Sequence, residues 1–215
     1  MTNNGINEIK ARFDKVAAGW DSNPGRIELA RAVGDAIRKA VPLRSDMNVM
    51  DFGAGTGLLT LALLPYVQSI TAVDASGEML RVLEQKLKSL GVNNVKTLQS
   101  DVRDLPAHES GYDLIVSSMV LHHIPDVFQA LRQLRPCLQT NGQIALADLD
   151  TEDGTFHPDP TGVFHHGLDR SKVCEWLRNA GFVDLASHDA YNIKRPSAGG
   201  GTKQYGVFLI TGRAN

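Results

Sequence analysis

One stretch near the start of the chain, residues 48–60, most constrains what this sequence can fold into. It begins with an apolar run, Val49-Met50-Asp51-Phe52, continues with glycines at positions 53, 55 and 57, and ends in a leucine-rich segment that begins at Leu58. A short apolar run that ends in glycine is typical of a buried strand, and the leucine-rich segment that reaches Pro65 is typical of a helix ended by proline. Glycine is needed where the backbone turns tightly or where a ligand comes closer than a Cβ atom allows. The stretch predicts a strand, a tight turn and a helix whose first amides face a ligand.

The spacing of the glycines separates two kinds of ligand. Dinucleotide sites use G-x-G-x-x-G, whereas here the third glycine comes one residue early, and Leu58 stands where that fingerprint has glycine. Asp51 precedes the turn, and its carboxylate would repel a pyrophosphate but attract an ammonium group. The pattern D-x-G-x-G-x-G resembles motif I of the class I S-adenosylmethionine-dependent methyltransferases. The resemblance implies S-adenosylmethionine as the cofactor, bound by Asp51, Gly53, Ala54, Gly55 and Gly57.

Two further acids follow predicted strands. Asp74 ends the strand over 69–74, at the distance of about 20 residues from the turn where a doubly wound fold places an acceptor for ribose hydroxyls. Asp101 follows a third strand and, by the resemblance, accepts from the adenine amine, with the amide of Val102 meeting a ring nitrogen. Asp104 is the alternative to Asp101. The resemblance assigns further cofactor contacts to Ala75, Met79, Ser117 and Trp20.

Two more segments resemble small-molecule methyltransferases. Residues 13–21 match the F-D-x-x-A-x-x-W-D segment that covers cofactor and substrate in that branch, and residues 117–123 match its S-x-x-x-L-H-H exit from strand four, as in the ubiquinone and menaquinone enzymes. Phe13 and Trp20 would place aromatic surface near a sulfonium; alternatively, both only anchor the N-terminal helices. The tetrad that DNA and RNA amino-methyltransferases carry at this exit is missing.

Five of the seven histidines lie between His122 and His166. His122 follows strand four and is the candidate general base; the alternative is a structural histidine. A metal site with nearby acids such as Asp150 is a further alternative, but adjacent histidines usually point in different directions, so each pair would offer at most one ligand. We expect no metal. The residues expected to contact the substrate are Phe13, His123, Asp148, His157, His165 and His166.

Composition narrows the class of protein. The net charge is −2, from 22 basic and 24 acidic residues, and the absence of a long basic run argues against nucleic acid as a partner. No apolar run approaches the roughly 20 residues of a membrane helix, and the first residues lack the pattern of a signal peptide. We expect a cytoplasmic protein. Cys137 and Cys174 lie far apart and are expected to be buried thiols.

We predict one α/β domain over residues 1–215. Apolar residues at helical spacing predict an N-terminal helical cap over 1–45. The resemblance implies a Rossmann-like, seven-stranded, mostly parallel sheet with an antiparallel last strand and helices on both faces. Residues 46–150 would hold the cofactor, and 151–215 the substrate loop and a C-terminal hairpin. We also expect a strand over 143–150 after a turn at Asn141-Gly142, strands over 182–191 and 205–211, and a flexible connection over 194–203.

The resemblance covers nearly the whole chain and implies transfer of a methyl group to a small-molecule acceptor. The reaction would be a direct in-line displacement, in which the protein mainly positions the reactants and excludes water. The alternatives are a protein that binds S-adenosylmethionine without catalysis, a methyltransferase acting on protein or RNA, and an NAD-dependent oxidoreductase, which Leu58 disfavours. Nothing in the sequence identifies the acceptor.

Overall fold

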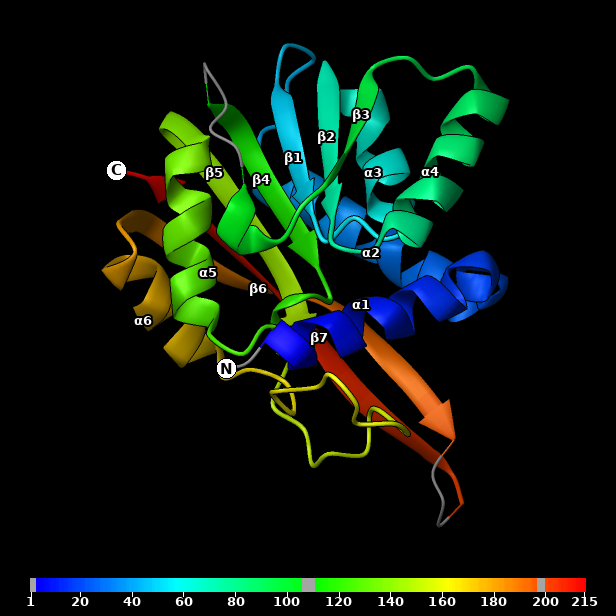
Figure 1. Ribbon diagram of the computed structural model, residues 1–215. Coiled ribbons are helices and arrows are strands. Elements are labelled where there is room, and N and C mark those ends of the chain that lie inside the picture. The colour runs from blue at the N-terminus through cyan, green and yellow to red at the C-terminus, as the bar shows by residue number, and fades with distance from the viewer. Residues whose placement is uncertain (1–2, 106–110, 197–199) are drawn as a thin grey trace.

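A seven-stranded sheet forms the centre of the computed structural model, which describes residues 3–105, 111–196 and 200–215 (Figure 1). The strand order is β3-β2-β1-β4-β5-β7-β6. The strands β1 to β5 pair in parallel, and β7 runs antiparallel to both β5 and β6. The predicted Rossmann-like sheet is confirmed. The strands are β1 (Asn48–Phe52), β2 (Ser69–Asp74), β3 (Val95–Gln99), β4 (Tyr112–Ser118), β5 (Leu138–Leu149), β6 (Phe182–Pro196) and β7 (Thr202–Ala214).

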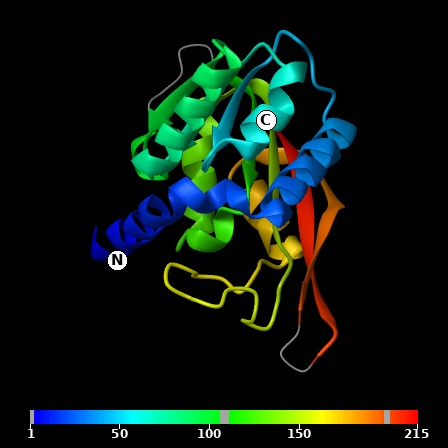
Figure 2. The ribbon, with the colours of Figure 1, turned by 90° about the vertical axis from the view of Figure 1, so that its right-hand side faces the viewer.

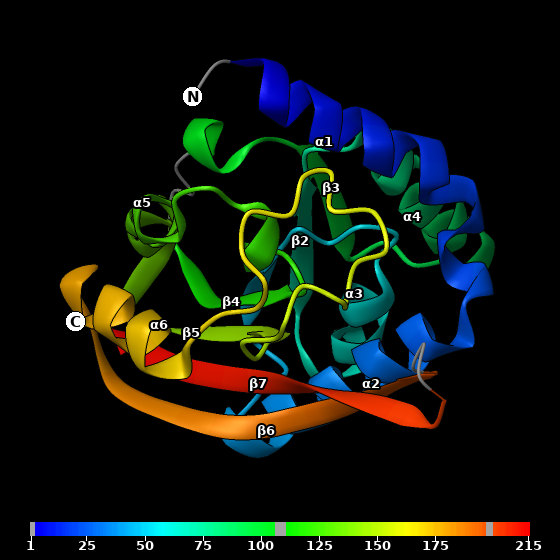
Figure 3. The same ribbon diagram turned by 90° about the horizontal axis from the view of Figure 1, so that it is seen from below.

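Helices cover both faces of the sheet. Side chains alternate along each strand, so Val49 of β1 packs with α2 and α3 on one face, whereas Met50 packs with α5 and α6 on the other (Figure 3). None of the helices in the described ranges has both the length and the apolar character needed to cross a membrane. The helices are α1 (Asn3–Val16), α2 (Pro24–Ala40), α3 (Leu58–Leu63), α4 (Gly77–Leu90), α5 (Val127–Leu134) and α6 (Arg170–Asn179), with short 3-10 turns η1 (Ala17–Ser22), η2 (Leu64–Tyr66), η3 (Val102–Asp104), η4 (Leu121–His123) and η5 (Arg135–Cys137).

Local sequence signals set the ends of several helices. The hydroxyl of Ser76 accepts a hydrogen bond of 3.1 Å from the amide of Met79 and caps α4. Gly91 ends the same helix in the left-handed conformation. The α-helix α3 stops at Leu63, two residues before Pro65. The end of α3 near Pro65 was expected from the sequence, and serine and glycine are residue types that favour the other two positions.

Two segments cover the carboxyl ends of the parallel strands, where ligands bind in open α/β sheets. The helix α1 and the loop over 150–169 both lie across this end (Figures 1 and 3). They are tied together because the side chain of Arg12 donates to the carbonyls of Asp159 and Thr161. The β6–β7 hairpin extends past the rest of the sheet on the same side (Figure 2).

The hairpin is longer than the sequence predicted. The strand β6 continues to Pro196 and β7 begins at Thr202, with Arg195 opposite Lys203, so the flexible connection expected over 194–203 is wrong at both ends. Residues 197–199 of that connection lie outside the described residues. The two strands pair with each other beyond the sheet, where polar side chains suit both faces, and a polar sequence therefore resembled a loop.

The strand β5 also begins earlier than predicted, at Leu138, and Asn141 and Gly142 lie within it rather than in a turn before it. The pairing of β5 with β4 shifts register here, and Asn141 adopts a left-handed φ of 62°. A bulge of this kind uses the residue types of a turn, which explains the error. Cys137 is buried as expected, but Cys174 is only half-buried.

The glycine turn follows β1 and depends on backbone conformations that favour glycine. Gly53, Gly55 and Gly57 have φ values of 74°, 55° and 81°, a region that costs other residues about 1–2 kcal/mol. A Cβ atom on Gly57 would also collide with the side chain of Leu83 in α4, which is fully buried. Gly57 is therefore required for packing the start of α3 against α4.

We predict that Gly57→Ala lowers the free energy of unfolding by about 2–4 kcal/mol, because left-handed strain adds to overpacking. Chemical denaturation measures this change. Gly19→Ala is the matched control, since a Cβ atom there meets nothing within 4 Å. In a Leu83→Ala background the cost of Gly57→Ala should shrink; equal costs in both backgrounds would show that the collision is unimportant.

Candidate active site

A cavity of about 650 Å³ lies at the carboxyl ends of β1, β2 and β4. Among the described residues, the predicted site residues that line it are Phe13, Trp20, Asp51, Gly53, Ala54, Gly55, Asp74, Ala75, Met79, Asp101, Val102 and His123. The predicted residues that do not line it are Gly57, Ser117, His122, Asp148, His157, His165 and His166. The structure thus gathers most of the predicted cofactor residues around one space and places most of the histidines outside it.

Asp74 fixes the shape of this cavity. Its carboxylate accepts hydrogen bonds from the amide of Gly55 (2.7 Å) and from the amide of Ser76 (2.8 Å), so it joins the glycine turn to the end of β2. Burial raises the pKa of Asp74, although these two amides act in the opposite direction. Each carboxylate oxygen can accept more than one hydrogen bond. The group can therefore hold the turn and still accept from a ligand in the cavity.

The structure favours Asp101 over the alternative, Asp104. Asp101 lines the cavity together with Val102 and Arg103, whereas Asp104 does not line it. One carboxylate oxygen of Asp101 accepts from the amide of Arg103 (3.0 Å) and from its side-chain Nε (2.7 Å). This local pairing holds the carboxylate at the start of η3, beside the cavity.

Two residues predicted to contact the cofactor do not line the cavity and instead contact other parts of the protein. Gly57 packs against Leu83, and the hydroxyl of buried Ser117 donates to the carbonyl of Phe52 at 2.8 Å. The next residue, Ser118, lines the cavity. Side chains alternate along β4, so Ser117 and Ser118 face opposite sides of the sheet. Counting every second residue from the buried Val116 leads to Ser118, so the alternation could have identified it as the serine at the cavity.

Sequence reasoning also missed cavity residues outside the recognisable patterns. Met119 follows β4 with a left-handed φ of 61° and lines the cavity. Further lining residues that no pattern indicated include Arg26, Ser100, Val120, Gln129 and Gln133.

The predicted N-terminal covering segment is held over the glycine turn by its two aspartates. Asp21 accepts from the hydroxyl of Thr56 in the turn (2.6 Å) and pairs with the ammonium group of Lys86 in α4 (2.5 Å). Asp14 accepts from the hydroxyl of Ser76 at 2.6 Å. The segment therefore contacts both the glycine turn and the start of α4, which Asp74 joins.

The aromatic residues of this segment lie at the cavity and also pack against each other. Phe13 and Trp20 line the cavity and touch each other edge to face, with ring centroids 5.8 Å apart. The guanidinium carbon of Arg26 lies 3.7 Å from the centre of the Trp20 ring, so one cation already occupies a face of that ring. Phe13 also contacts His123, with ring centroids 5.2 Å apart.

Asp51 is an ionisable group buried beside the turn, with only 1% of its surface exposed. It accepts from the hydroxyl of Thr60 at 2.5 Å. Burial raises the pKa of Asp51 to about 7, and the charge of Asp74 acts in the same direction. A cationic group bound next to it would favour the ionised carboxylate, which suits the ammonium partner expected from the sequence.

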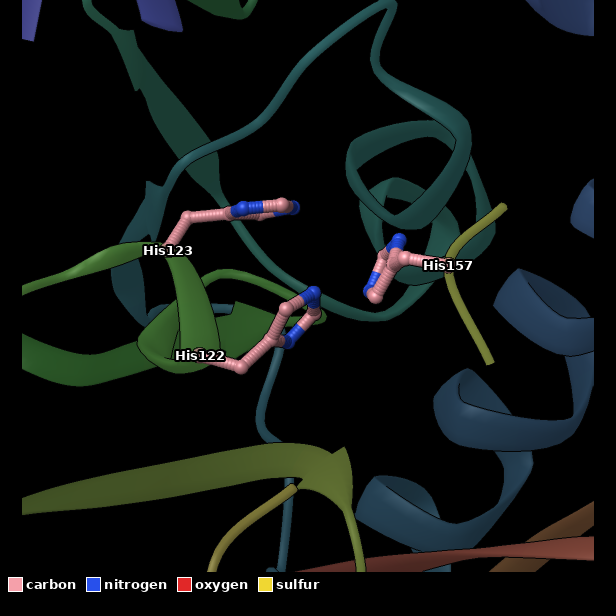
Figure 4. Close-up of side chains that lie close together, drawn as sticks. All are labelled: His122, His123 and His157. Atoms are coloured by element: carbon pink, nitrogen blue, oxygen red, sulfur yellow. The ribbon is translucent and has the colours of Figure 1, made fainter. Parts of the chain in front are cut away.

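Three histidines form a separate group at the edge of the cavity. His122 and His123 come from η4, and His157 comes from the loop over 150–169; one ring nitrogen of each lies within 4.8 Å of the others (Figure 4). The expectation that an adjacent pair offers at most one ligand is therefore wrong for His122 and His123. The short turn η4 changes the direction of the backbone, so the two rings lie only 4.1 Å apart between centroids.

Burial and mutual repulsion keep two of these rings neutral. Burial and the neighbouring His122 lower the pKa of His123 to about 3. Burial, His122 and the guanidinium groups of Arg12 and Arg195 lower the pKa of His157 to about 4. Neutral imidazole is the form that accepts protons or binds metals.

The carboxylate of Asp148 fixes the position of the His122 ring. This carboxylate lies 2.5 Å from Nδ1 of His122 and accepts from the amides of Leu121 and Leu149, both at 2.7 Å. Burial alone would raise the pKa of Asp148, but His122 and the Leu149 amide outweigh it, and the pKa lies below its usual value. His122 is 1% exposed and does not line the cavity, so this geometry does not support direct contact between His122 and a ligand there.

The other two histidines of the loop point elsewhere. Nε2 of His165 lies 2.9 Å from the carbonyl of Ile124, and Nδ1 of His166 lies 3.5 Å from Glu152 with most of its ring in solvent. Both therefore support the loop and do not join the three-histidine group.

Comparisons with known proteins agree with this architecture. The family described as a methyltransferase domain matches residues 49–142. An uncharacterized methyltransferase of Schizosaccharomyces pombe is 34% identical over 138 residues, which cover 58% of this chain and 49% of that protein. A demethylmenaquinone methyltransferase of Listeria welshimeri is 24% identical over 153 residues, covering 69% of this chain and 65% of that protein. The chain thus spans about half to two thirds of these curated relatives.

A solved structure extends the likeness to the whole fold. The crystal structure of a SAM-dependent methyltransferase from Aquifex aeolicus superposes with a TM-score of 0.69 at 20% identity, covering 96% of this chain and 98% of that chain. Sheet order and the likeness to this solved structure define a Rossmann-like fold. The part of the chain that matches the methyltransferase-domain family, residues 49–142, holds the glycine turn, Asp74 and Asp101. The cofactor on which the Aquifex aeolicus protein is named as dependent is S-adenosylmethionine.

We predict that Asp51→Asn changes stability in a pH-dependent way. The carboxyl has an ordinary pKa of 3.8 and a folded pKa of about 7, so between these values the folded state binds more protons than the unfolded state. The free energy of unfolding therefore falls as the pH rises from about 4 to about 7. Removing the charge should raise that free energy at pH 8 by on the order of 2–4 kcal/mol, and by much less at pH 4.5.

Denaturation of the ligand-free protein at the two pH values measures this effect. Asp35→Asn is the control, because that carboxylate is exposed and pairs with Arg38 on the same helix. An equal gain at both pH values would contradict the raised pKa of Asp51.

Proposed function

We propose that this chain transfers the methyl group of S-adenosylmethionine to a small-molecule acceptor. The observation that carries the proposal is the cavity itself. The glycine turn, Asp74 and Asp101 all line one continuous space, and Asp74 also accepts a hydrogen bond from the amide of Gly55 in the turn. This arrangement offers acceptors for a ribose and for an exocyclic amine, and a buried acid, Asp51, for an ammonium group.

The proposed roles follow from the position of each group. Asp74 would accept from the ribose hydroxyls, Asp101 and the amide of Val102 would meet the adenine, and Asp51 would lie near the ammonium of the methionine part. Gly55 leaves open space, because a Cβ atom there meets nothing within 4 Å. A ligand can approach the backbone at this point more closely than at any side chain.

The reaction would be a single in-line displacement. The acceptor atom forms a bond to the methyl carbon while the carbon–sulfur bond breaks, and its electron pair stays on sulfur to give the neutral thioether. Because the sulfonium is already an activated leaving group, the protein contributes mainly position and exclusion of water. The N-terminal segment that Asp14 and Asp21 attach over the cavity supports this role.

Support for a small acceptor comes from two sources. Residues of α1 and η1 line the cavity, with Phe13, Trp20 and Met119 among its walls, and the Listeria relative is named a demethylmenaquinone methyltransferase. His123 is the imidazole that faces the cavity and would lie beside the acceptor. The cytoplasmic location expected from the sequence stays a prediction.

The first test is calorimetric titration of the full chain with S-adenosylmethionine, S-adenosylhomocysteine and NAD. We expect micromolar binding of the first two and none of NAD. Asp74→Asn and Asp101→Asn should each weaken binding about 10-fold or more, because a hydrogen bond to a charged group contributes about 1.5–3 kcal/mol. Asp104→Asn, which alters an acid outside the cavity, should bind as the wild type does.

Three results would contradict the proposal. Binding of NAD alone would indicate an oxidoreductase. Binding of S-adenosylmethionine without methyl transfer to any fraction of a metabolite extract would indicate a non-catalytic binding protein, and label in the RNA or protein fraction would indicate a macromolecular acceptor.

A second prediction uses the open space at Gly55. Gly55→Ala should weaken S-adenosylhomocysteine binding about 10-fold or more, because the added methyl group projects into the ligand space, while stability falls by only about 1–2 kcal/mol. For Gly57→Ala we expect the opposite balance, with a smaller effect on S-adenosylhomocysteine binding and a larger loss of stability. If Gly55→Ala binds the cofactor normally, the ligand does not pass close to the turn.

A further inference from the structure

The group formed by His122, His123 and His157 has a feature that the proposed methyl transfer does not use. Nε2 of His122 and Nε2 of His157 are buried and have no hydrogen-bond partner. Buried polar atoms without a partner are uncommon and call for a bound water or ion. The three rings approach one another from two segments far apart in the sequence, η4 and the loop over 150–169 (Figure 4).

In two of the three rings, those of His122 and His123, Nδ1 already has a hydrogen-bond partner. Nδ1 of His122 lies 2.5 Å from the Asp148 carboxylate, and Nδ1 of His123 lies 2.6 Å from the carbonyl of Gly162. Both partners are acceptors, so each Nδ1 carries a proton, and Nε2 of each ring is the nitrogen left to bind a metal ion. Metal-binding histidines are oriented in this way by a carboxylate or a carbonyl behind the ring.

We propose that His122, His123 and His157 bind one divalent transition-metal ion of the zinc type. Three imidazoles and one open position make a common catalytic zinc site, and nitrogen ligands exclude the hard cations that prefer oxygen. Nitrogens bound to tetrahedral zinc lie roughly 3.3 Å apart, somewhat closer than the 4.8 Å limit found here. His157 lies in a loop, and a small shift of that loop closes the site.

The charged side chains around the three histidines indicate the charge of a fourth ligand on the metal ion. Asp148 supplies a buried negative charge behind His122, whereas the guanidinium groups of Arg12 and Arg195 act on His157. Two cations near the ion favour an anionic exchangeable ligand. Because His123 also lines the cavity, an acceptor thiol or hydroxyl could occupy that position; this last step rests on the proposed function.

Metal binding is tested on the full chain without S-adenosylmethionine. The protein is stripped with a chelator, dialysed, and titrated with Zn²⁺ in competition with a chromophoric chelator. We expect one ion per chain with submicromolar affinity. His157→Ala and His122→Ala should weaken binding more than 100-fold, and Asp148→Asn about 10- to 100-fold through the orientation of His122. With Co²⁺ we expect the visible absorption of a tetrahedral site.

The controls separate this inference from the proposed function. His188→Ala removes an exposed histidine of β6 and should leave Zn²⁺ binding unchanged. S-adenosylhomocysteine titration of every variant reports folding: His157→Ala changes only a loop side chain and should bind this ligand normally, even if the buried His122→Ala variant does not fold.

Zn²⁺ affinity weaker than about 100 μM, or equal affinity in wild type and His157→Ala, would overturn the metal site while leaving the cofactor proposal intact. If the wild type does not bind S-adenosylhomocysteine, the proposed function is overturned, whereas the result on Zn²⁺ binding still stands.

Discussion

The carboxylate of Asp74 is the contact on which the site depends. It accepts one amide from the glycine turn, at Gly55, and one from the start of α4, at Ser76. The carbonyl of Val73 accepts the amides of Gly53 and Ala54 as well. These bonds fix the end of β1 against the end of β2, so the turn is held open toward the cavity. A buried acid is unfavourable alone, and here the amides satisfy it.

The covering segments are attached to the same frame. Asp21 bonds Thr56 of the turn, and the loop over 150–169 contacts both α1, through Arg12, and η4, through the carbonyl of His122. The cover therefore consists of polar contacts at its edges and aromatic contacts at its centre. Such contacts are individually weak in water, which is consistent with segments that must open for ligands to enter and leave.

Much of the fold could be predicted from the sequence because its signals are local. The apolar strands, the cap at Ser76 and the stop at Gly91 each depend on residues within a few positions of one another. The bounds of β5 and of the β6–β7 hairpin could not be predicted, because a bulge at Asn141 and a pairing of Arg195 with Lys203 use residue types that also occur in turns.

The sequence by itself determined the class of fold and the residues of the turn, since the spacing of Gly53, Gly55 and Gly57 permits few backbone conformations. Only the tertiary structure decided which side chains share a space. It placed Ser118 rather than Ser117 at the cavity and brought His157 to within 4.8 Å of His122 and His123. The reason is physical: the side a strand residue faces and the path of a long loop are set by packing between distant segments, which no local pattern records.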